Sequence, residues 1–522
     1  MPPRGPPDPL LRAPLVVTGH LVTFDDAQPE IPDGALYVDV HGAIQAVQRR
    51  TDPAPRGFEG ATTVETGGIV YPGLIDLHNH IAYNCLPLWI ASDHPSPWRS
   101  REQWPKDASY KPDVSLPANA LCQADGKAVL KYVEVKALVG GVTAIQGSAK
   151  VARPVEGSMI RHVEFETFGS GRPTVNQSVR AFTQRGQYDD AKRDLDAGHA
   201  FLYHLAEGTS DRLIADFEGC RGHGVLAPRF LGIHATALQP PQFAEWSAFG
   251  GAVIWSPFSN IWLYGATTDV VAARAAGMRI CLGADWSPSG SKHLLGELKV
   301  ADLWNRTALN GSFGDPELCA MVTCNPADAL GWSDRLGRLK PRLRGDFLVL
   351  RTRPGEDPYR TLIESTEPDV LLVAVNGYPL YGTDELMHGA NARRPESIDV
   401  SPALRRTVNL LDERFRDADM SWPQVLAALR AARGAPSAAR AAALARDGGE
   451  EALIGLRPDK PWDDPEQNPA IAREVAHAVQ TQAVTIPEPD TLTHDAAYFE
   501  RVSAATIPAG KLDGLQAYYV GS

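Results

Sequence analysis

Residues 71–80 read Tyr71-Pro72-Gly73-Leu74-Ile75-Asp76-Leu77-His78-Asn79-His80, and this stretch decides the predicted fold. A short apolar run behind a Pro-Gly step is typical of a buried parallel strand, here Leu74 to Leu77. Side chains alternate along a strand, so His78 and His80 leave the same side of the chain, as two ligands of one metal must. A barrel enzyme keeps its active site at the carboxyl end of such strands.

The length and charge of the chain narrow the classes of function. The 522 residues are enough for a barrel with satellite domains, and 43% hydrophobic with 22% charged residues is ordinary for a soluble globular protein. The formal net charge of -12 argues against a nucleic-acid binder, which would show a basic face. We therefore expect a small neutral or cationic substrate, and neither a nucleic acid nor a membrane as partner.

The N-terminal and cysteine patterns favour a cytoplasmic protein. Residues Met1 to Pro7 are proline-rich and lack the charged start and apolar core of a secretory signal. No apolar run approaches the roughly 18 residues that a membrane helix needs. The six cysteines are scattered without Cys-x-x-Cys spacing, so we expect neither a disulfide framework nor a structural zinc knuckle.

Short β-rich runs open the chain and return after its middle. In residues 14–68 the runs 15–17, 20–24, 35–40 and 43–47 alternate with turns such as His-Gly, which predicts a small antiparallel sheet. Similar runs return at 345–350 and 370–380. We expect these late strands to complete the early sheet, so that residues 1–68 and 336–390 form two halves of a small β-sandwich.

Strand-like and helical runs alternate between these halves, which predicts an α/β fold. Together with the opening strand they make eight strands in residues 69–335, the number that closes a (β/α)8 TIM-like barrel. The seven further runs are 142–146, 162–168, 174–179, 200–204, 229–234, 252–256 and 279–285.

The connection from residue 81 to about residue 117 is too long to be an ordinary loop. It is rich in Trp, Pro and Ser, and its Trp89, Trp98 and Trp104 suit a cover over a pocket.

Residues 391–522 form the last predicted part, a helical extension with an irregular tail. An Ala-, Arg- and Leu-rich run predicts helices from about 400 to 448, and a proline-rich segment follows. We recognise no chemistry in this part. Its tail could clasp the body or a second subunit, and we expect a homo-oligomer, specifically a dimer.

Ionisable residues stand where other barrel strands should end. The fifth strand closes in His204, with Glu207 three residues later, the sixth closes in His234, and the eighth closes in Asp285. One such histidine alone is more often structural, and one such aspartate often caps the next helix. The recurrence at several strand ends predicts instead that these residues share one site with the opening histidines.

Several motifs follow one another in order between about residues 15 and 390. They are Pro72 to His80, His204-Leu205-Ala206-Glu207, His234, Ser256-Pro257-Phe258-Ser259-Asn260, Leu282-Gly283-Ala284-Asp285, Asn325-Pro326-Ala327-Asp328-Ala329-Leu330-Gly331 and Gly345-Asp346-Phe347-Leu348-Val349-Leu350. This ordered set resembles the amidohydrolase superfamily, in particular its mononuclear cytosine deaminase-like and triazine hydrolase-like branch. The resemblance implies one divalent metal bound by His78, His80, His204 and Asp285.

The resemblance also assigns catalytic roles: Glu207 would shuttle protons, and His234 would hydrogen-bond the bound water or the substrate. Zn2+ with an open position lowers the pKa of bound water toward about 7, and the resulting hydroxide attacks an sp2 carbon attached to nitrogen. The tetrahedral centre collapses once the leaving nitrogen is protonated, and Glu207 is placed to deliver that proton. Asp285 could both bind the metal and accept the proton of the water.

One metal per chain is expected, with Zn2+ as the default. The binuclear branch of the superfamily bridges two metals with a carboxylated lysine on the fourth strand, and residues 174–179 contain no lysine. Imidazole and carboxylate ligands also suit Fe2+ or Mn2+.

Substrate contacts are expected from strand-end and loop positions. The candidates are Tyr83, Asn84, Trp89, Gln177, Trp255, Asn260 and Trp286. Tryptophans beside a metal suit a flat or apolar substrate. Asn260 could instead hold its own loop through side-chain to backbone hydrogen bonds.

The predicted function is metal-dependent hydrolysis of a carbon–nitrogen bond, not a peptide bond, in a small cyclic molecule. Deamination of an amino-heterocycle or amidine is the leading reaction, because expelling ammonia demands a proton donor such as Glu207. The same site could open the ring of a cyclic amide, as imidazolonepropionase-like relatives do. A third hypothesis, a non-catalytic barrel scaffold, predicts eroded ligands, whereas all the expected ones are present in the sequence.

Overall fold

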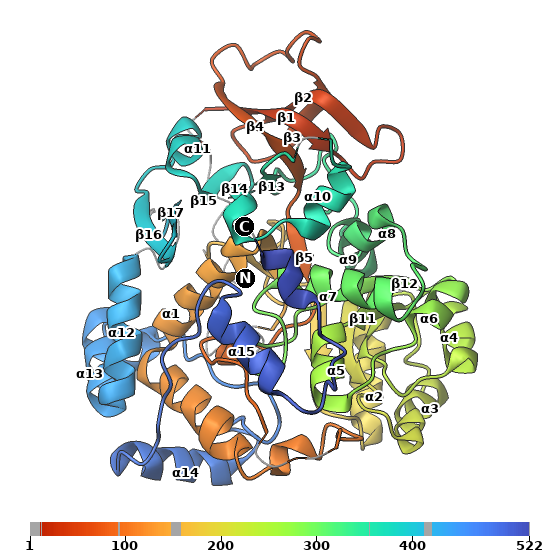
Figure 1. The fold of residues 1–522 in the computed structure, drawn as a ribbon, viewed down its shortest axis with the longest axis vertical. Helices are drawn as coiled ribbons and strands as arrows, with labels where there is room; N and C mark the ends of the chain where they lie inside the picture. Colours follow the sequence, from red (N-terminus) through yellow and green to blue (C-terminus); the bar gives the residue numbers. More distant parts are fainter. Residues whose placement is uncertain are drawn as a thin grey trace.

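The computed structural model of the chain describes residues 11, 13–91, 94, 96–147, 158–353, 355–411 and 420–520. A barrel surrounded by helices forms the body, a sheet covers one end of it, and the C-terminal helices lie along its side (Figure 1). The predicted α/β fold with a TIM-like barrel is confirmed.

The barrel consists of parallel strands in two hydrogen-bonded groups, ordered β5-β6-β7 and β12-β11-β10-β9-β8. The strands are β5 Leu74–Asp76, β6 Val142–Ile145, β7 Arg161–His162, β8 Val175–Ser178, β9 Ala200–Leu205, β10 Phe230–His234, β11 Ala252–Trp255 and β12 Arg279–Leu282. Just beyond β5 and β12, Asn79 bridges Asp285, and the backbone N–H of His80 donates to the Asp285 carbonyl at 2.9 Å. The segments that carry candidate ligands therefore also tie the first strand to the last.

One barrel strand is shorter than predicted. A strand was expected over residues 162–168, but β7 ends at His162. The backbone N–H groups of Phe165 and Glu166 both donate to the His162 carbonyl at 2.9 Å, so the chain turns there and the following apolar residues leave the sheet.

Helices pack around these strands and bury their apolar faces against them. Their bounds are α1 Leu116–Val139, α2 Arg185–Asp196, α3 Ile214–Gly222, α4 Pro240–Ser247, α5 Pro257–Tyr264, α6 Val270–Ala275, α7 Leu294–Thr307, α8 Asp315–Ala320 and α9 Cys324–Leu330. The helix α1 is kinked at Asp125 (φ -157°, ψ 81°), whose carboxylate accepts the backbone N–H of Ala128 at 3.0 Å. This side chain caps the second half of the helix, which explains the break.

The early and late strands form one nine-stranded sheet, ordered β16-β17-β15-β14-β13-β4-β1-β2-β3. The strands are β1 Leu15–Val22, β2 Glu30–Val38, β3 Ile44–Arg49, β4 Thr62–Pro72, β13 Phe347–Leu350, β14 Val370–Val375, β15 Tyr378–Gly382, β16 Glu396–Ser401 and β17 Leu404–Val408. Antiparallel pairing of β13 with β4, from Phe347 opposite Pro72 to Leu350 opposite Ile69, confirms that late strands complete the early sheet. Because β4 leads through Gly73 into β5, the sheet anchors the strand that precedes His78.

Two outer parts of this sheet differ from expectation. The predicted runs 15–17 and 20–24 are largely one strand, β1, with a register shift between Gly19 and Leu21. Helices were expected from about residue 400, but β16 and β17 form a hairpin there and α12 begins only at Trp422. The four-part division of the chain at residues 68, 335 and 390 stays a prediction.

The C-terminal part is helical after this hairpin. The remaining helices are α10 Pro358–Glu364, α11 Asp384–Gly389, α12 Trp422–Gly434, α13 Pro436–Asp447, α14 Pro469–Gln480 and α15 Ala496–Ala504. Both α12 and α13 pack against α1, at the left of the body in Figure 1. The segment between α13 and α14 leaves the surface and runs into the body, where Asp459 and Lys460 are at most 4% exposed.

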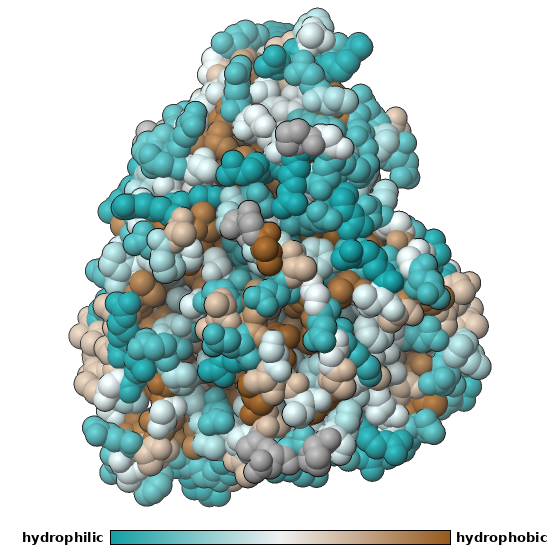
Figure 2. Space-filling model, in the orientation of Figure 1, coloured by the Kyte–Doolittle hydropathy of each residue, from teal (hydrophilic) through white to brown (hydrophobic). Residues whose placement is uncertain are grey.

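The surface is mixed in polarity. On the face shown in Figure 2, hydrophilic residues predominate and apolar ones are scattered. Within the described ranges, no helix is both long and apolar enough to cross a membrane. All six cysteines are buried and free.

Candidate metal centre

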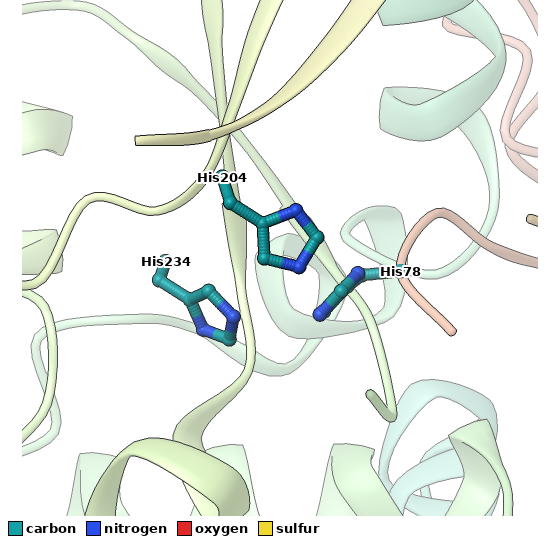
Figure 3. Close-up of side chains that lie close together, drawn as sticks. All are labelled: His78, His204 and His234. Atoms are coloured by element: carbon teal, nitrogen blue, oxygen red, sulfur yellow. The ribbon is translucent and has the colours of Figure 1, made fainter. Parts of the chain in front are cut away.

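The four predicted metal ligands and the predicted catalytic residue His234 converge at the carboxyl ends of the barrel strands. His78 and His80 follow β5, His204 lies in β9, His234 ends β10, and Asp285 follows β12. Each is at most 2% exposed. In Figure 3 the rings of His78, His204 and His234 point toward one another.

The donor atoms lie close enough to share one ion. His78 Nε2 lies 3.1 Å from Asp285 Oδ1, and His80 Nε2 lies 3.4 Å from the same oxygen. His204 Nε2 lies 3.4 Å from His80 Nε2. His234 belongs to the cluster too, since one nitrogen each of His78, His204 and His234 lie within 4.8 Å of one another.

This donor set fits a divalent metal. Both ring nitrogens of His78 and the Asp285 Oδ1 atom are buried without a hydrogen-bond partner among the described residues. Buried polar atoms without partners are costly, so their convergence at one point indicates a ligand. Imidazole nitrogens with one carboxylate oxygen are ligands that Zn2+ accepts.

The protonation states also suit a metal. Burial holds the pKa of His204 well below its usual range, and the neighbouring imidazoles lower it further. Burial lowers the pKa of His234 to about 4, against the attraction of Glu207. Burial would raise the pKa of Asp285, but the close approach of the His78 ring, 3.1 Å from Oδ1, holds it well below its usual range. Neutral imidazoles and an ionised carboxylate are the metal-binding forms.

The backbone is strained at these strand ends. Ala206, His234 and Asp285 adopt left-handed conformations with φ of 47°, 65° and 64°. Non-glycine residues rarely adopt such angles, at a cost on the order of 1–3 kcal/mol each, and they cluster at functional sites. The strain turns the chain sharply where each strand ends and aims the side chains across the barrel mouth.

Glu207 lies beside the histidine cluster and is held from several sides. Its Oε1 accepts the Tyr264 hydroxyl at 2.6 Å and lies 3.8 Å from His234 Nε2, and its Oε2 lies 3.6 Å from an Arg101 nitrogen. Burial would raise the pKa of Glu207, but His234 and Arg101 bring it below its usual value. Glu207 is therefore an ionised carboxylate that can accept a proton.

Three of the predicted substrate residues lie against the cluster. The Trp286 ring centroid is 6.1 Å from that of His80, and the Tyr83 ring is 4.8 Å from that of Trp286. Asn260 Oδ1 pairs with His234 Nδ1 at 2.9 Å, while its amide nitrogen points to the hydroxyls of two threonines. Asn260 thus fixes the orientation of the His234 ring.

The other four predicted substrate residues have other side-chain partners. Trp89 donates to Ser109, Trp255 donates to Thr267, and Gln177 donates to Glu164. The side chain of Asn84 donates to Asn79, and its Oδ1 accepts the backbone N–H of Ser287. Within the described part of the chain, these four side chains make no hydrogen bond to the histidine rings. Their role as substrate contacts stays a prediction.

Trp104, from the long connection after β5, packs against residues that lie beside the cluster. Its ring lies 5.6 Å from the Trp286 ring, and its Nε1 donates to Tyr264 at 3.1 Å. Trp89 and Trp98 stack on each other at 5.6 Å. Arg101, from the same connection, and Tyr264, at the end of α5, were not singled out by the sequence analysis, because neither follows a strand.

The C-terminal extension supplies further residues that the sequence analysis missed. Both carboxylate oxygens of Asp459 lie 2.8 Å from His80 Nδ1. Lys460 Nζ lies 4.1 Å from the Trp286 ring centroid, and Asp463 accepts the Tyr83 hydroxyl at 2.8 Å. Three aspartates, two prolines and a tryptophan within Arg457–Asp464 are a signal that could have marked this segment.

Comparison with known proteins finds no matching family model. A 5-methylthioadenosine/S-adenosylhomocysteine deaminase of Pelotomaculum thermopropionicum is 26% identical over 412 residues, which cover 70% of this chain and 92% of that protein. The same-named enzyme of Halobacterium salinarum is 26% identical over 64% of this chain and 84% of its own length.

Two solved structures share the fold. A triazine hydrolase from Arthrobacter aurescens matches with a TM-score of 0.56 at 20% identity, over 73% of this chain and 99% of that one. An adenosine deaminase from Xanthomonas campestris, solved with bound zinc, matches with a TM-score of 0.59 at 17% identity, over 82% and 99%. At such identities the likeness to these two structures shows the barrel fold alone.

Proposed function

We propose that the chain is a metal-dependent hydrolase of the amidohydrolase superfamily and that it deaminates an amino-substituted heterocycle, in line with its deaminase relatives. The bond it cleaves is a carbon–nitrogen bond other than a peptide bond. The observation that carries this proposal is the buried set of His78, His80, His204 and Asp285 with the ionised Glu207 beside it. The names of the curated relatives, which are deaminases, point the same way.

We assign one Zn2+ to the four residues His78, His80, His204 and Asp285. Their unpartnered donor atoms and protonation states support this assignment. The bound ion supplies a Lewis acid that lowers the pKa of water toward about 7. The absence of lysine from β8 and its flanks, residues 174–179, supports a single ion.

Glu207 moves the proton in this proposal. As an ionised carboxylate it takes a proton from the attacking water, and it then returns that proton to the leaving nitrogen, so that ammonia departs as a neutral molecule. Tyr264 and Arg101 hold both carboxylate oxygens in place. His234 donates from Nδ1 to Asn260, so its Nε2 faces the cluster as an acceptor for the water.

The aromatic side chains beside the histidines favour a flat substrate. Trp286, Trp104 and Tyr83 lie together beside His80, and aromatic faces attract heteroaromatic rings through stacking. We therefore propose a purine-type amino-heterocycle as the first substrate class to test, in line with the named substrates of the relatives.

The test is release of ammonia. Zinc-loaded protein is offered adenosine, 5-methylthioadenosine, S-adenosylhomocysteine, guanine and amino-triazines, together with cyclic amides that lack an exocyclic amine. We expect ammonia from at least one amino-heterocycle. Ring opening of a cyclic amide without ammonia from any amino compound would replace deamination by the alternative reaction.

Replacing Glu207 by Gln should leave the zinc content unchanged and lower kcat by ~100-fold or more, the loss typical of a missing general acid-base. Metal analysis and ammonia assays on the same preparation measure both quantities. Glu245→Gln, a change of a partly exposed glutamate on α4, is the matched control and should retain full activity. Full activity in Glu207→Gln would remove this residue from the mechanism.

The predicted dimer and cytoplasmic location remain proposals. Light scattering of the purified full chain at micromolar concentration tests the first, and fractionation of cells tests the second.

A further inference from the structure

Buried charges mark residues Arg457–Asp464, here called the inserted segment. Asp459, Lys460, Asp463 and Asp464 are at most 4% exposed. Charged groups are almost never buried at such a level without partners or a function, because leaving water costs several kcal/mol per ion. The segment therefore has a specific role inside the body, although it belongs to neither the barrel nor the sheet.

Asp459 contacts a candidate metal ligand on the side away from the metal. Both of its oxygens lie 2.8 Å from His80 Nδ1, whereas His80 Nε2 faces Asp285 Oδ1 and His204 Nε2, each at 3.4 Å. A carboxylate at Nδ1 requires the proton on that nitrogen, which leaves the Nε2 lone pair free. The ring is thus held in the tautomer and orientation that a metal needs.

We propose that Asp459 is a positioning residue of the metal centre, so that the C-terminal extension completes the active site. This inference rests on the proposed function, since it takes the zinc site as given. Partners of this kind on a ligating histidine typically change metal affinity 10- to 100-fold.

Hydrogen bonds anchor the inserted segment a few residues after Asp459. Asp463 accepts the Tyr83 hydroxyl at 2.8 Å, and its backbone carbonyl accepts the Asn119 amide at 3.1 Å. Trp462 Nε1 donates to the Tyr110 hydroxyl at 3.1 Å. Contacts to the connection after β5 and to α1 thus hold the inserted segment, and with it Asp459, in place.

Lys460 provides a comparison in which zinc affinity should change in the opposite direction. Its ammonium group lies over the Trp286 and Trp104 rings, with Nζ 4.1 Å and 5.5 Å from their centroids. A cation near a metal site opposes metal binding, whereas a carboxylate on a ligand favours it. Neutralising Lys460 and neutralising Asp459 should therefore change metal affinity in opposite directions, although both changes alter the same short segment.

The experiment titrates zinc into metal-free full-length protein in competition with a chromogenic chelator, without substrate. We expect Asp459→Ala to weaken zinc binding 10- to 100-fold, and Asp459→Asn to weaken it less, since the amide oxygen can still accept from His80 Nδ1. Lys460→Met should bind zinc at least as tightly as the wild type. Asp464→Asn is the matched control: it neutralises another buried acid of the segment, 3.3 Å from Arg457, and should leave zinc affinity unchanged.

The outcomes separate this inference from the proposed function. Zinc affinity of Asp459→Ala within about twofold of the wild type overturns the role of Asp459 and leaves the hydrolase proposal intact. Equal weakening by Asp459→Ala, Lys460→Met and Asp464→Asn also overturns it, because the segment then acts by packing alone. Melting temperatures of the metal-free variants identify any that fail to fold. If Asp459→Ala fails to fold, the zinc affinity of Asp459→Asn, whose side chain has nearly the same shape, decides whether Asp459 supports metal binding. A wild-type protein that binds no zinc overturns both proposals.

Discussion

Replacing Tyr264 by Phe should slow the reaction by changing the protonation of Glu207 without removing the metal. The Tyr264 hydroxyl donates to Glu207 Oε1 at 2.6 Å, and among the described residues it makes no hydrogen bond to a candidate metal ligand. Burial raises the pKa of Glu207, while His234, Arg101 and this hydrogen bond lower it. Without the hydroxyl, the pKa of Glu207 rises and the carboxylate loses its fixed orientation.

The expected loss of kcat/KM follows from the strength of a hydrogen bond to the ionised Glu207. A hydrogen bond to an ionised group contributes about 1.5–3 kcal/mol. At about 1.4 kcal/mol per factor of ten, kcat/KM should fall roughly 10- to 150-fold at neutral pH. The ionised form accepts the proton, so a higher pKa moves the acid limb of the pH profile to higher pH. Part of the loss should be recovered under alkaline conditions.

The assay is kcat/KM for ammonia release between pH 5 and 9, with zinc content measured on each preparation. Tyr381→Phe is the matched control, because the Tyr381 hydroxyl is buried in β15 without a hydrogen-bond partner among the described residues. An unchanged acid limb in Tyr264→Phe, with zinc retained and kcat/KM near the wild-type value, would refute the reasoning about Glu207.

Two further predictions concern stability. Zinc at 1,000 times its Kd should raise the free energy of unfolding by about 4 kcal/mol, so chelation should lower Tm in a thermal scan; an equal Tm with and without chelator would contradict the assigned site. Burial raises the pKa of Glu297 on α7 from its usual 4.5 to about 8. The folded state therefore keeps a proton that the unfolded chain loses, and the free energy of unfolding should fall as pH rises from about 4.5 to 8, by at most about 1.4 kcal/mol per pH unit. Glu297→Gln should flatten this dependence in denaturant titrations at pH 6, 7 and 8, and parallel pH dependences in both proteins would argue against it.

The barrel and its histidines could be predicted because local rules govern them. A parallel strand is apolar along its length and presents its last side chains at one rim, so a polar residue after an apolar run marks the site wherever it occurs. His78, His204 and Asp285 all follow this rule. The strand expected over 162–168 ends early for a local reason as well: a turn begins at His162, and the hydrophobic pattern of the sequence does not reveal this turn.

The outer parts of the site could not be predicted in this way. Arg101, Tyr264 and Asp459 lie on a connection, a helix end and an irregular segment, and no repeating pattern ties such places to the rim. Asp459 follows His80 by 379 residues, and only the packed structure brings them into contact. The charged residues of the inserted segment can be read from the sequence, but the sequence does not show that they are buried.

The same separation matters while the protein is being made. A ribosome that adds about 5–20 residues per second needs roughly 20 to 75 s to travel the 379 residues from His80 to Asp459. Throughout that interval the growing chain carries His80 without the carboxylate that orients its ring. Metal loading should therefore come late, after the chain has left the exit tunnel, and a message broken before codon 459 should yield a product that captures zinc poorly.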